Sequence, residues 1–469
     1  GCSLDVRGIR NWLIAACVVT ATMSLGADVR GFPTVHLVPK IETRASDFLA
    51  AHPEYDGAGV TVAIFDDGLD PGAPGLQVTP DGRPKVIDVI DATGSGDVPL
   101  SDPVAPENGQ IEGLSGKMLT VPAEWGDELR LGIKSAYEFF PEELVDRMRS
   151  EWTEQWMERQ QTRANELIQQ IDRWDDEHPD ADDELKQEKE ELEAQLAALR
   201  HAIDNYEDPG PIYDCVVFQD GDEWRVAIDT NENGDLTDEE LLSEFDVDHE
   251  YGTFADDSSL NFGVHVYDEG KTLSIVIPAG SHGTHVAGTI AQLTNNNIGV
   301  AGIAYNVKIM PLKVISAGDF IFSWDTIFAP GNDGGSAPLV ADATRHAAAN
   351  GAKVINLSLG GPGEAPPLLD AIEYAVSRGA FVAIAAGNSG QDGNPVDYPA
   401  SYAAQVNGAM AVGAVNRNLR HASYSSFHPY VEICAPGGEM TDDFDFERGV
   451  TQIGYEEEST LSYLDVFEK

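Results

Sequence analysis

The chain has 469 residues, with 80 Asp or Glu side chains against 29 Lys or Arg, so its formal net charge is −51. A negative charge of this size disfavours binding to nucleic acid or to anionic membranes. The acidic residues are spread along the chain, which indicates a solvated surface. Such a protein suits a saline environment, where salt screens the repulsion between its carboxylates. Hydrophobic residues make up 42% of the chain, which is normal for a packed core in two or three domains.

Residues 1–27 have the layout of a secretory signal peptide. Arg7 and Arg10 precede an apolar run at residues 12–23, and small residues lead to a cleavage site at the end of the segment. The alternative is a lipoprotein cleavage box at Cys17, although the apolar run before it is short. We therefore expect an exported protein, periplasmic or extracellular. No later stretch is long and apolar enough to span a bilayer.

A buried strand that ends in a carboxylate is predicted at residues 60–66. Apart from Thr61, residues 60–65 are apolar; Asp66 follows them, and Gly68 permits a turn. A carboxylate in this place often only closes the turn. It can also lie at the C-terminal edge of a parallel sheet, where ligands bind, so Asp66 is a candidate catalytic residue.

Two amphipathic helices are predicted in the acidic middle of the chain. Apolar residues recur mostly three or four positions apart over residues 142–174 and again over residues 185–203, and Pro179 breaks the pattern between them. The pair indicates an antiparallel helical hairpin. It could be an assembly arm, which would suit a homo-oligomer, or a substrate lid, or a surface hairpin docked on the catalytic domain.

Residues 229–240 fit the twelve-residue calcium loop. Side chains with oxygen atoms fall at the ligand positions, and Gly234 makes the turn at position six. A predicted strand at residues 224–228 precedes the loop in place of a helix, so the alternative is a solvated acidic turn. The predicted ligands of a structural Ca²⁺ are Asp229, Asn231, Asn233, Asp235, Thr237 and Glu240.

Residues 281–289 could place a general base at the start of a buried helix. His282 would lie on a small, apolar helix that packs tightly and holds the ring still for proton transfer. His282 and His285 are three positions apart with no Glu between them, so the usual zinc-binding helix pattern does not fit. A lone histidine is usually structural, and the case for catalysis therefore depends on the other segments.

Strands and helices alternate in the sequence after His282. We expect strands at residues 308–314, 352–357 and 380–385 and helices at residues 339–350 and 368–378. This alternation predicts an α/β fold with a parallel sheet that is covered on both faces and binds ligands at the C-terminal ends of its strands. Asn388 follows the last strand; it could close a turn or donate a hydrogen bond to an oxyanion.

Together these segments resemble the subtilisin-like serine peptidases, which carry an acid, a base and an oxyanion donor in this chain order. The resemblance implies that Asp66 orients the imidazole, that His282 takes the proton of the nucleophile, and that Asn388 steadies the oxyanion. It also implies that an extended peptide or protein substrate pairs with a strand and that catalysis needs no cofactor. The matching substrate-binding residues are Leu357, Ser358, Leu359, Gly360 and Gly361.

The nucleophile segment of that family is not recognisable in this sequence. The family carries a Gly-Thr-Ser-Met-Ala type turn shortly after a segment like residues 433–438, but this chain continues to Lys469 without one. Ser459 falls near the expected distance, yet the three glutamates before it would oppose a developing oxyanion. We expect the nucleophile to lie beyond this chain or to be lost from it, as in a fragment or a disrupted reading frame.

Within the family, the resemblance is to the tripeptidyl-peptidase II branch. It rests on the long separation of Asp66 from His282 and on segments such as residues 70–75 and 91–98. The branch is understood to remove tripeptides because two glutamates cap the substrate's amino group, one of them directly after the glycine of the substrate strand. A second glycine stands there in this chain, and Glu364 is the nearest carboxylate. Endopeptidase and tripeptidyl-peptidase cleavage therefore both stay open.

The expected fold is a subtilisin-like, doubly wound, mostly parallel α/β sheet with a large insertion. The expected function is serine-type proteolysis; the alternative is a catalytically inactive, secreted, calcium-binding relative that docks peptides without cutting them. The expected division is a signal peptide at 1–27, the catalytic domain at 28–98 and 279–438, a hairpin insertion at 99–214, a β segment with the calcium loop at 215–278, and an acidic tail at 439–469.

Overall fold

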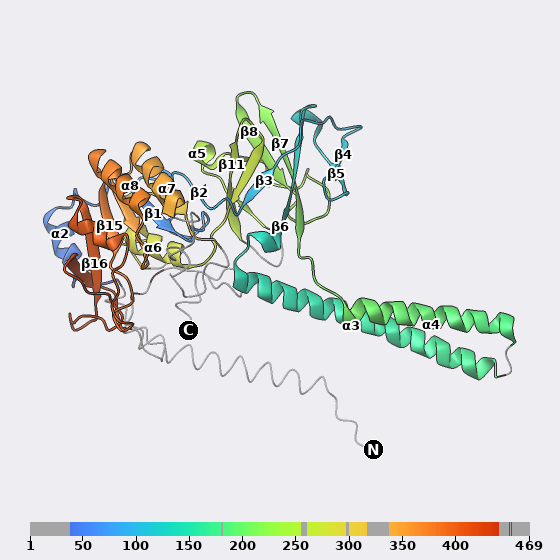
Figure 1. The fold of residues 1–469 in the computed structure, drawn as a ribbon. Helices are drawn as coiled ribbons and strands as arrows, with labels where there is room; N and C mark the ends of the chain where they lie inside the picture. The colour runs from blue at the N-terminus through green and yellow to red at the C-terminus, as the bar shows by residue number, and fades with distance from the viewer. Residues whose placement is uncertain are drawn as a thin grey trace, which may run out of the picture.

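The computed structural model describes residues 38–179, 182–254, 260–296, 300–316 and 337–439, together with residues 450 and 452. The predicted signal peptide, Ser459 and nearly all of the acidic tail lie outside the described residues. The described chain has an α/β part and a β-rich part, and a long helical arm projects from the β-rich part (Figure 1).

Seven parallel strands form the central sheet of the α/β part, which confirms the predicted fold class. In spatial order they are β17 (Val431–Pro436), β16 (Ala409–Val415), β15 (Phe381–Ala385), β14 (Val354–Leu357), β1 (Thr61–Asp66), β13 (Lys308–Lys313) and β2 (Ile90–Asp91). The predicted strands at residues 308–314, 352–357 and 380–385 are therefore confirmed as β13, β14 and β15, within two residues at each end.

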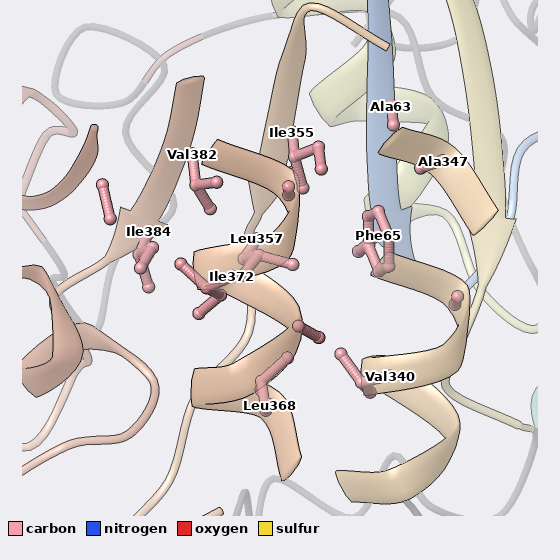
Figure 2. Close-up of a cluster of buried hydrophobic side chains, with 14 of the residues drawn as sticks. Ala63, Phe65, Val340, Ala347, Ile355, Leu357, Leu368, Ile372, Val382 and Ile384 are labelled. Carbon is pink, nitrogen blue, oxygen red and sulfur yellow. The ribbon is translucent and has the colours of Figure 1, made fainter. Parts of the chain in front are cut away.

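Helices cover the two faces of this sheet. The predicted pair of helices after residue 337, α7 (Ala337–Ala349) and α8 (Pro366–Ser377), packs on one face, where Phe65 and Leu357 meet Val340 (Figure 2). Helix α6 (His282–Ala291) packs on the opposite face, where Ile64 meets Ala287. Side chains alternate along a strand, so Asp66 lies on the same face of β1 as Ile64, which is the face that carries α6.

The β-rich part consists of antiparallel sheets. One sheet has the order β10 (Gly252–Thr253), β11 (Asn261–Tyr267), β12 (Thr272–Val276) and β3 (Asp97–Pro99); a second has β6 (Arg130–Ser135), β7 (Ile212–Asp220), β8 (Glu223–Ile228) and β9 (Leu242–Ser243); β4 (Gln110–Glu112) pairs with β5 (Met118–Thr120). The two four-stranded sheets share one core, in which the aromatic rings of Phe139, Phe140 and Phe254 pack together. Short helices complete the described chain: α2 (Ala45–Ala51), α5 (Phe245–Asp248), η1 (Ala123–Trp125), η2 (Ala136–Glu138) and η3 (Ala400–Ala404).

The arm is the predicted helical hairpin. It consists of α3 (Glu142–Glu177) and α4 (Asp183–Asp204), which lie side by side (Figure 1). At 1.5 Å per residue α3 is roughly 54 Å long, and only its first turns, at Leu144 and Met148, enter the core of the β-rich part. The hairpin is therefore anchored at one end and is not docked along the catalytic domain. None of the helices in the described ranges is long and apolar enough to cross a membrane.

The structure moves two of the expected segment boundaries. Strand β3 crosses the expected boundary between residues 98 and 99, and it pairs with β12 of the expected β segment. The expected boundary between residues 214 and 215 falls inside β7, which pairs with both β6 and β8. Hydrogen bonds between strands define the sheets, and the paired strands are distant in the sequence. The expected hairpin insertion and the expected β segment therefore fold together as one β unit, which also contains residues 97–99.

Candidate active site

Asp66 and His282 are hydrogen-bonded partners at the junction of β1 and α6. His282 Nδ1 lies 2.7 Å from Asp66 Oδ1, although the two residues are 216 positions apart in the sequence. Asp66 is 1% exposed, and its Oδ1 also accepts the Asp67 backbone N–H at 2.9 Å. The N–H of the next residue thus holds the carboxylate while it binds the imidazole, and the carboxylate fixes the tautomer in which Nδ1 carries the proton.

The His282 ring is open to solvent on the side away from Asp66. Its side chain is 46% exposed, and Nε2 is the nitrogen left for an incoming proton. The negative charge of Asp66 raises the pKa of His282; burial opposes this, and the hydrogen bond to Asp66 adds to the rise. An imidazole that is both accessible and poised to become positively charged has the properties of a general base.

Gly283 allows α6 to approach β1 closely. A Cβ atom added there would lie 2.0 Å from the backbone oxygen of Gly68 and 3.0 Å from the Asp66 Cβ. Any side chain at position 283 would therefore push the first turn of the helix away from the strand. The His-Gly pair thus combines the base with the contact that brings it to the acid.

The other two candidate segments end at the same edge of the sheet. Phe65 is level with Leu357, so Asp66 is level with Ser358, and Leu357 is in turn level with Ile384 of β15. Asn388 follows the end of β15 by three residues and is exposed. The predicted acid, substrate strand and oxyanion donor therefore lie at the C-terminal ends of three neighbouring strands.

A network that the sequence analysis missed holds the turn at Asn388. Ser426 donates its hydroxyl to Asp397 Oδ2 at 2.8 Å, accepts the Ser389 N–H at 3.1 Å, and donates its own N–H to the Gly387 oxygen at 2.9 Å. A Cβ atom at Gly387, whose φ is +101°, would lie 2.2 Å from Asp397 Oδ2. The turn is therefore clamped on both sides of Asn388. No local pattern signals this, because Ser426 is remote in sequence.

The predicted substrate strand is only partly available for pairing. Gly361 exchanges two backbone hydrogen bonds with Tyr398, at 2.9 and 2.7 Å. Leu359 is buried at 1% exposure, while Ser358 and Gly360 are half-buried. An added peptide strand would therefore pair with the stretch before Gly361.

The chain returns to α6 near its described C-terminal end. The ring of His285, one turn after His282, donates a hydrogen bond to the backbone of Val450. Burial lowers the pKa of His285, the charge of His282 lowers it further, and the bond to Val450 opposes both. Gln452 is 2% exposed and donates to the Val300 oxygen at 2.8 Å. His285 thus has a contact of its own that does not involve Asp66.

The predicted calcium loop is a series of tight turns. The side-chain oxygens of Asn231, Asn233 and Asp235 each accept the backbone N–H two residues later, at 2.6 to 3.1 Å. The carboxylate that reaches back into the loop is Glu239, which accepts the Thr230 N–H at 2.8 Å, whereas Glu240 is exposed. In the part of the chain that the structure describes, no three His, Cys, Asp or Glu side chains gather into a metal site. Calcium binding therefore stays a prediction.

Comparison with known proteins decides the family. The sequence profile of the subtilase family matches residues 57–466, which include all the candidate catalytic residues. The chain belongs to the subtilase family. Subtilases are serine peptidases with this α/β fold, so the predicted family and fold are confirmed.

Relatives of this subtilase include much longer proteins. It is 42% identical over 289 residues to "Tripeptidyl-peptidase 2" of Arabidopsis thaliana and 35% identical over 306 residues to that of Drosophila melanogaster, which covers 59% and 62% of this chain but 21% of each relative. It is also 39% identical over 158 residues to "Subtilisin DY" of Bacillus licheniformis, covering 33% of this chain and 51% of that protein. The chain thus spans about a fifth of the length of the tripeptidyl-peptidase 2 relatives.

A solved structure shares the fold. The crystal structure of tripeptidyl peptidase 2 superposes with a TM-score of 0.55 at 24% identity, over 83% of this chain and 32% of the other. At this identity the likeness concerns the fold alone. It extends over more of the chain than the α/β part, so the insertion belongs to the shared architecture.

Proposed function

We propose that this chain supplies the acid, the base and the substrate strand of a peptidase in the tripeptidyl-peptidase II branch. The observation that carries the proposal is the 2.7 Å contact between Asp66 Oδ1 and His282 Nδ1, with the ring 46% exposed. A buried carboxylate on one imidazole nitrogen and free access to the other is the arrangement that general-base catalysis on a hydroxyl needs.

The chemistry would follow from these positions. His282 Nε2 takes the proton of a serine hydroxyl as its oxygen attacks the peptide carbonyl, and Asp66 stabilises the imidazolium that forms. The Asn388 amide donates to the oxyanion. His282 then returns the proton to the leaving amine, which leaves an acyl-enzyme that water hydrolyses. Backbone groups around Ser358 and Gly360 hold the peptide as an added strand.

The nucleophile would come from sequence that follows Gln452. Two observations support this origin: Val450 accepts a hydrogen bond from His285 of α6, and among the described residues the α6 face of the sheet carries exposed apolar side chains beyond β14. On that face Phe381 is 40% exposed and Ile433 is 52% exposed. Apolar side chains of this size on a sheet face favour a covering element. A helix placed there would begin near His282 and bring the serine with it.

Fluorophosphonate labelling tests the proposal, because only an activated serine reacts covalently. We expect the full-length protein to be labelled, His282→Ala and Asp66→Asn to lose labelling, and His346→Ala, which changes an exposed histidine on α7, to keep it. If the unmodified protein is not labelled but still binds an extended peptide, the inactive, peptide-docking relative is the better description. If His282→Ala is labelled normally, the proposed base is wrong.

The mode of cleavage needs a separate experiment. Glu364, the nearest carboxylate after the substrate strand, accepts a hydrogen bond from the Tyr398 hydroxyl at 3.0 Å, so it is held against Tyr398. We propose endopeptidase cleavage, because no glutamate follows Gly360 directly. Matched peptides with a free and an acetylated amino terminus should then be cut at similar rates. A strict need for the free amine would establish tripeptidyl cleavage.

We also propose that the protein is exported. Amino-terminal sequencing of the protein recovered from the periplasm or medium should give a mature chain that starts after Ala27. A chain recovered with residues 1–27 intact in the cytoplasm would contradict this. Light scattering on the same sample would show whether the arm accompanies a homo-oligomer.

A further inference from the structure

Asp67, the residue after the candidate acid, binds the start of the helix that carries the candidate base. Its Oδ2 accepts the backbone N–H of His282 at 3.0 Å, and its Oδ1 accepts that of Gly283 at 2.6 Å. The first N–H groups of a helix have no partner within it. Asp67 therefore supplies, from 215 positions away, the capping that a nearby side chain usually provides.

The helix depends on this distant cap. Ser281 precedes the helix at the capping position but makes no capping side-chain hydrogen bond. Helix α6 has only 10 residues and no acidic residue in its first turn, so the two Asp67 oxygens are the side-chain acceptors that the structure shows for its first N–H groups. Asp67 is itself fully buried, at 0% exposure, and so it has a fixed position.

Two consecutive carboxylates thus hold His282 at two points. Asp66 binds the ring at Nδ1, and Asp67 binds the backbone of the same residue. The Asp67 backbone oxygen also accepts the Ala279 N–H at 2.7 Å, which ties the segment before α6 to the same loop. Because the ring and the backbone of His282 are bound to two adjacent residues at the end of β1, the imidazole cannot rotate independently of Asp66.

Charged and titratable groups face Asp67 from its own strand end, from α6 and from β13. Asp66 lies next to it, His282 lies above it on α6, and Lys313 of β13 is paired with Asp91 of β2. Burial raises the pKa of Asp67 well above its usual range, and the charge of Asp66 raises it further. The charge of Asp67 in turn acts on Lys313, since together with Asp91 it opposes the lowering of the Lys313 pKa by burial.

We propose that Asp67 is a positioning residue of this active site, which keeps the His282 imidazole in hydrogen-bond reach of Asp66 by capping the first turn of α6. The proposal rests on the proposed function, in which His282 is the base. It assigns no substrate contact to Asp67, because the side chain is buried.

Nuclear magnetic resonance of His282 tests the proposal without a nucleophile. In the full-length protein we expect a slowly exchanging Nδ1 proton and a pKa above the usual histidine value. Asp67→Ala should remove the Nδ1 proton signal and return the pKa toward that value, because the ring no longer stays on Asp66. Asp67→Asn keeps one acceptor oxygen and a good capping residue, so it should retain the signal. Asp214→Asn, which changes a carboxyl that is 1% exposed in the β-rich part, is the matched control and should change neither.

A second measurement separates positioning from simple loss of structure. In a protein that reacts with fluorophosphonate, Asp67→Ala should lower the labelling rate roughly 100-fold, the usual effect of a small misplacement of a reacting group. Its affinity for an extended peptide should be unchanged, because the buried Asp67 side chain binds backbone N–H groups at the start of α6. The proposal would be overturned if Asp67→Ala lost peptide affinity by the same factor as labelling rate. It would also be overturned if the Nδ1 proton signal and the pKa of His282 did not change in this variant. If Asp67→Ala does not fold, Asp67→Ser, whose short side chain cannot reach both N–H groups, takes its place. If fluorophosphonate never labels the protein but the Asp67 variants show the expected changes at His282, the catalytic function is refuted. The capping of α6 by Asp67 would still hold.

Discussion

Lys313 Nζ lies 3.8 Å from Asp91 Oδ2, and both side chains have 0% exposure. Lys313 is level with Asp66 across the β1–β13 pair, so this ion pair is buried directly beside the candidate acid. Lys313 also donates to the Ser95 hydroxyl at 2.8 Å, and Asp91 accepts the backbone N–H groups of Thr93 and Gly96. Burial alone would raise the pKa of Asp91, but the charge of Lys313 and hydrogen bonds from the Thr93 and Ser95 hydroxyls and the Gly96 N–H lower it below its usual value.

Lys313→Met should destabilise the protein by about 3–5 kcal/mol, because it leaves the Asp91 charge buried without its partner. The double variant Lys313→Met/Asp91→Asn should recover part of this loss, since Asn keeps an acceptor for the nearby N–H groups. Urea unfolding measures both, with Lys353→Met at an exposed position as the control. A loss no larger than that of the control would show that the pair contributes nothing to stability.

Asp70→Asn should stabilise the protein above pH 6. Burial raises the pKa of Asp70 to about 6 from 3.8, although hydrogen bonds from Asn261 and Gly72 oppose the rise. The folded state therefore holds the Asp70 proton more tightly than the unfolded state, so stability is lost as the pH rises from about 4 through 6. At 1.36 kcal/mol per pKa unit the loss approaches roughly 3 kcal/mol at neutral pH.

Asn at position 70 keeps the Oδ1 acceptor for Asn261, which donates at 2.8 Å, and carries no charge. The free energy of unfolding of the two proteins, measured by urea at several pH values, should coincide near pH 4 and diverge with the variant more stable at pH 7 to 8. Parallel curves at all pH values would mean that Asp70 titrates normally in the folded state.

Calcium should bind once, at residues 229–240, by isothermal titration. Glu240→Gln should weaken binding at least 10-fold if residue 240 is the twelfth, bidentate ligand. Glu239→Gln is the matched control, because Glu239 caps the loop by accepting the Thr230 and Asn231 N–H groups. A larger loss in Glu239→Gln would shift the ligand register by one residue. An unmodified protein that takes up no calcium would make the loop a solvated acidic turn.

The melting temperature should rise with salt, because a net charge of −51 opposes the compact state. Between about 0.01 M and 0.15 M salt the Debye length falls from roughly 30 to 8 Å, which screens most repulsion between exposed carboxylates. Sodium and potassium chloride should act alike, since screening depends on ionic strength. A melting temperature that is flat or falls over this range would contradict both the repulsion and the saline setting.

Local patterns in the sequence were enough to predict the strands β1, β8, β13, β14 and β15, the helices α6, α7 and α8, and the arm, but not β16, β17 or the other strands of the β-rich part. The mostly apolar run at residues 60–65 and the period of 3.6 in residues 142–174 are short-range patterns, which depend on residues that are close together in the sequence. His282 and Asp66 were predicted as a pair from their segments and from family resemblance. Their 2.7 Å contact forms because alternate side chains of β1 face α6, and Asp66 is one of them.

Only the tertiary structure decided which polar groups meet across long separations. The sequence analysis did not single out Asp67 or Lys313, and it placed Gly361 in the substrate strand. Their partners are the start of α6, Asp91 and Tyr398, respectively. The order of the strands in the sheet fixes these partnerships, because it places β13 and β14 on either side of β1. A buried charge or N–H group needs a hydrogen-bond or ion-pair partner. Local sequence patterns do not identify that partner when it is distant in the sequence.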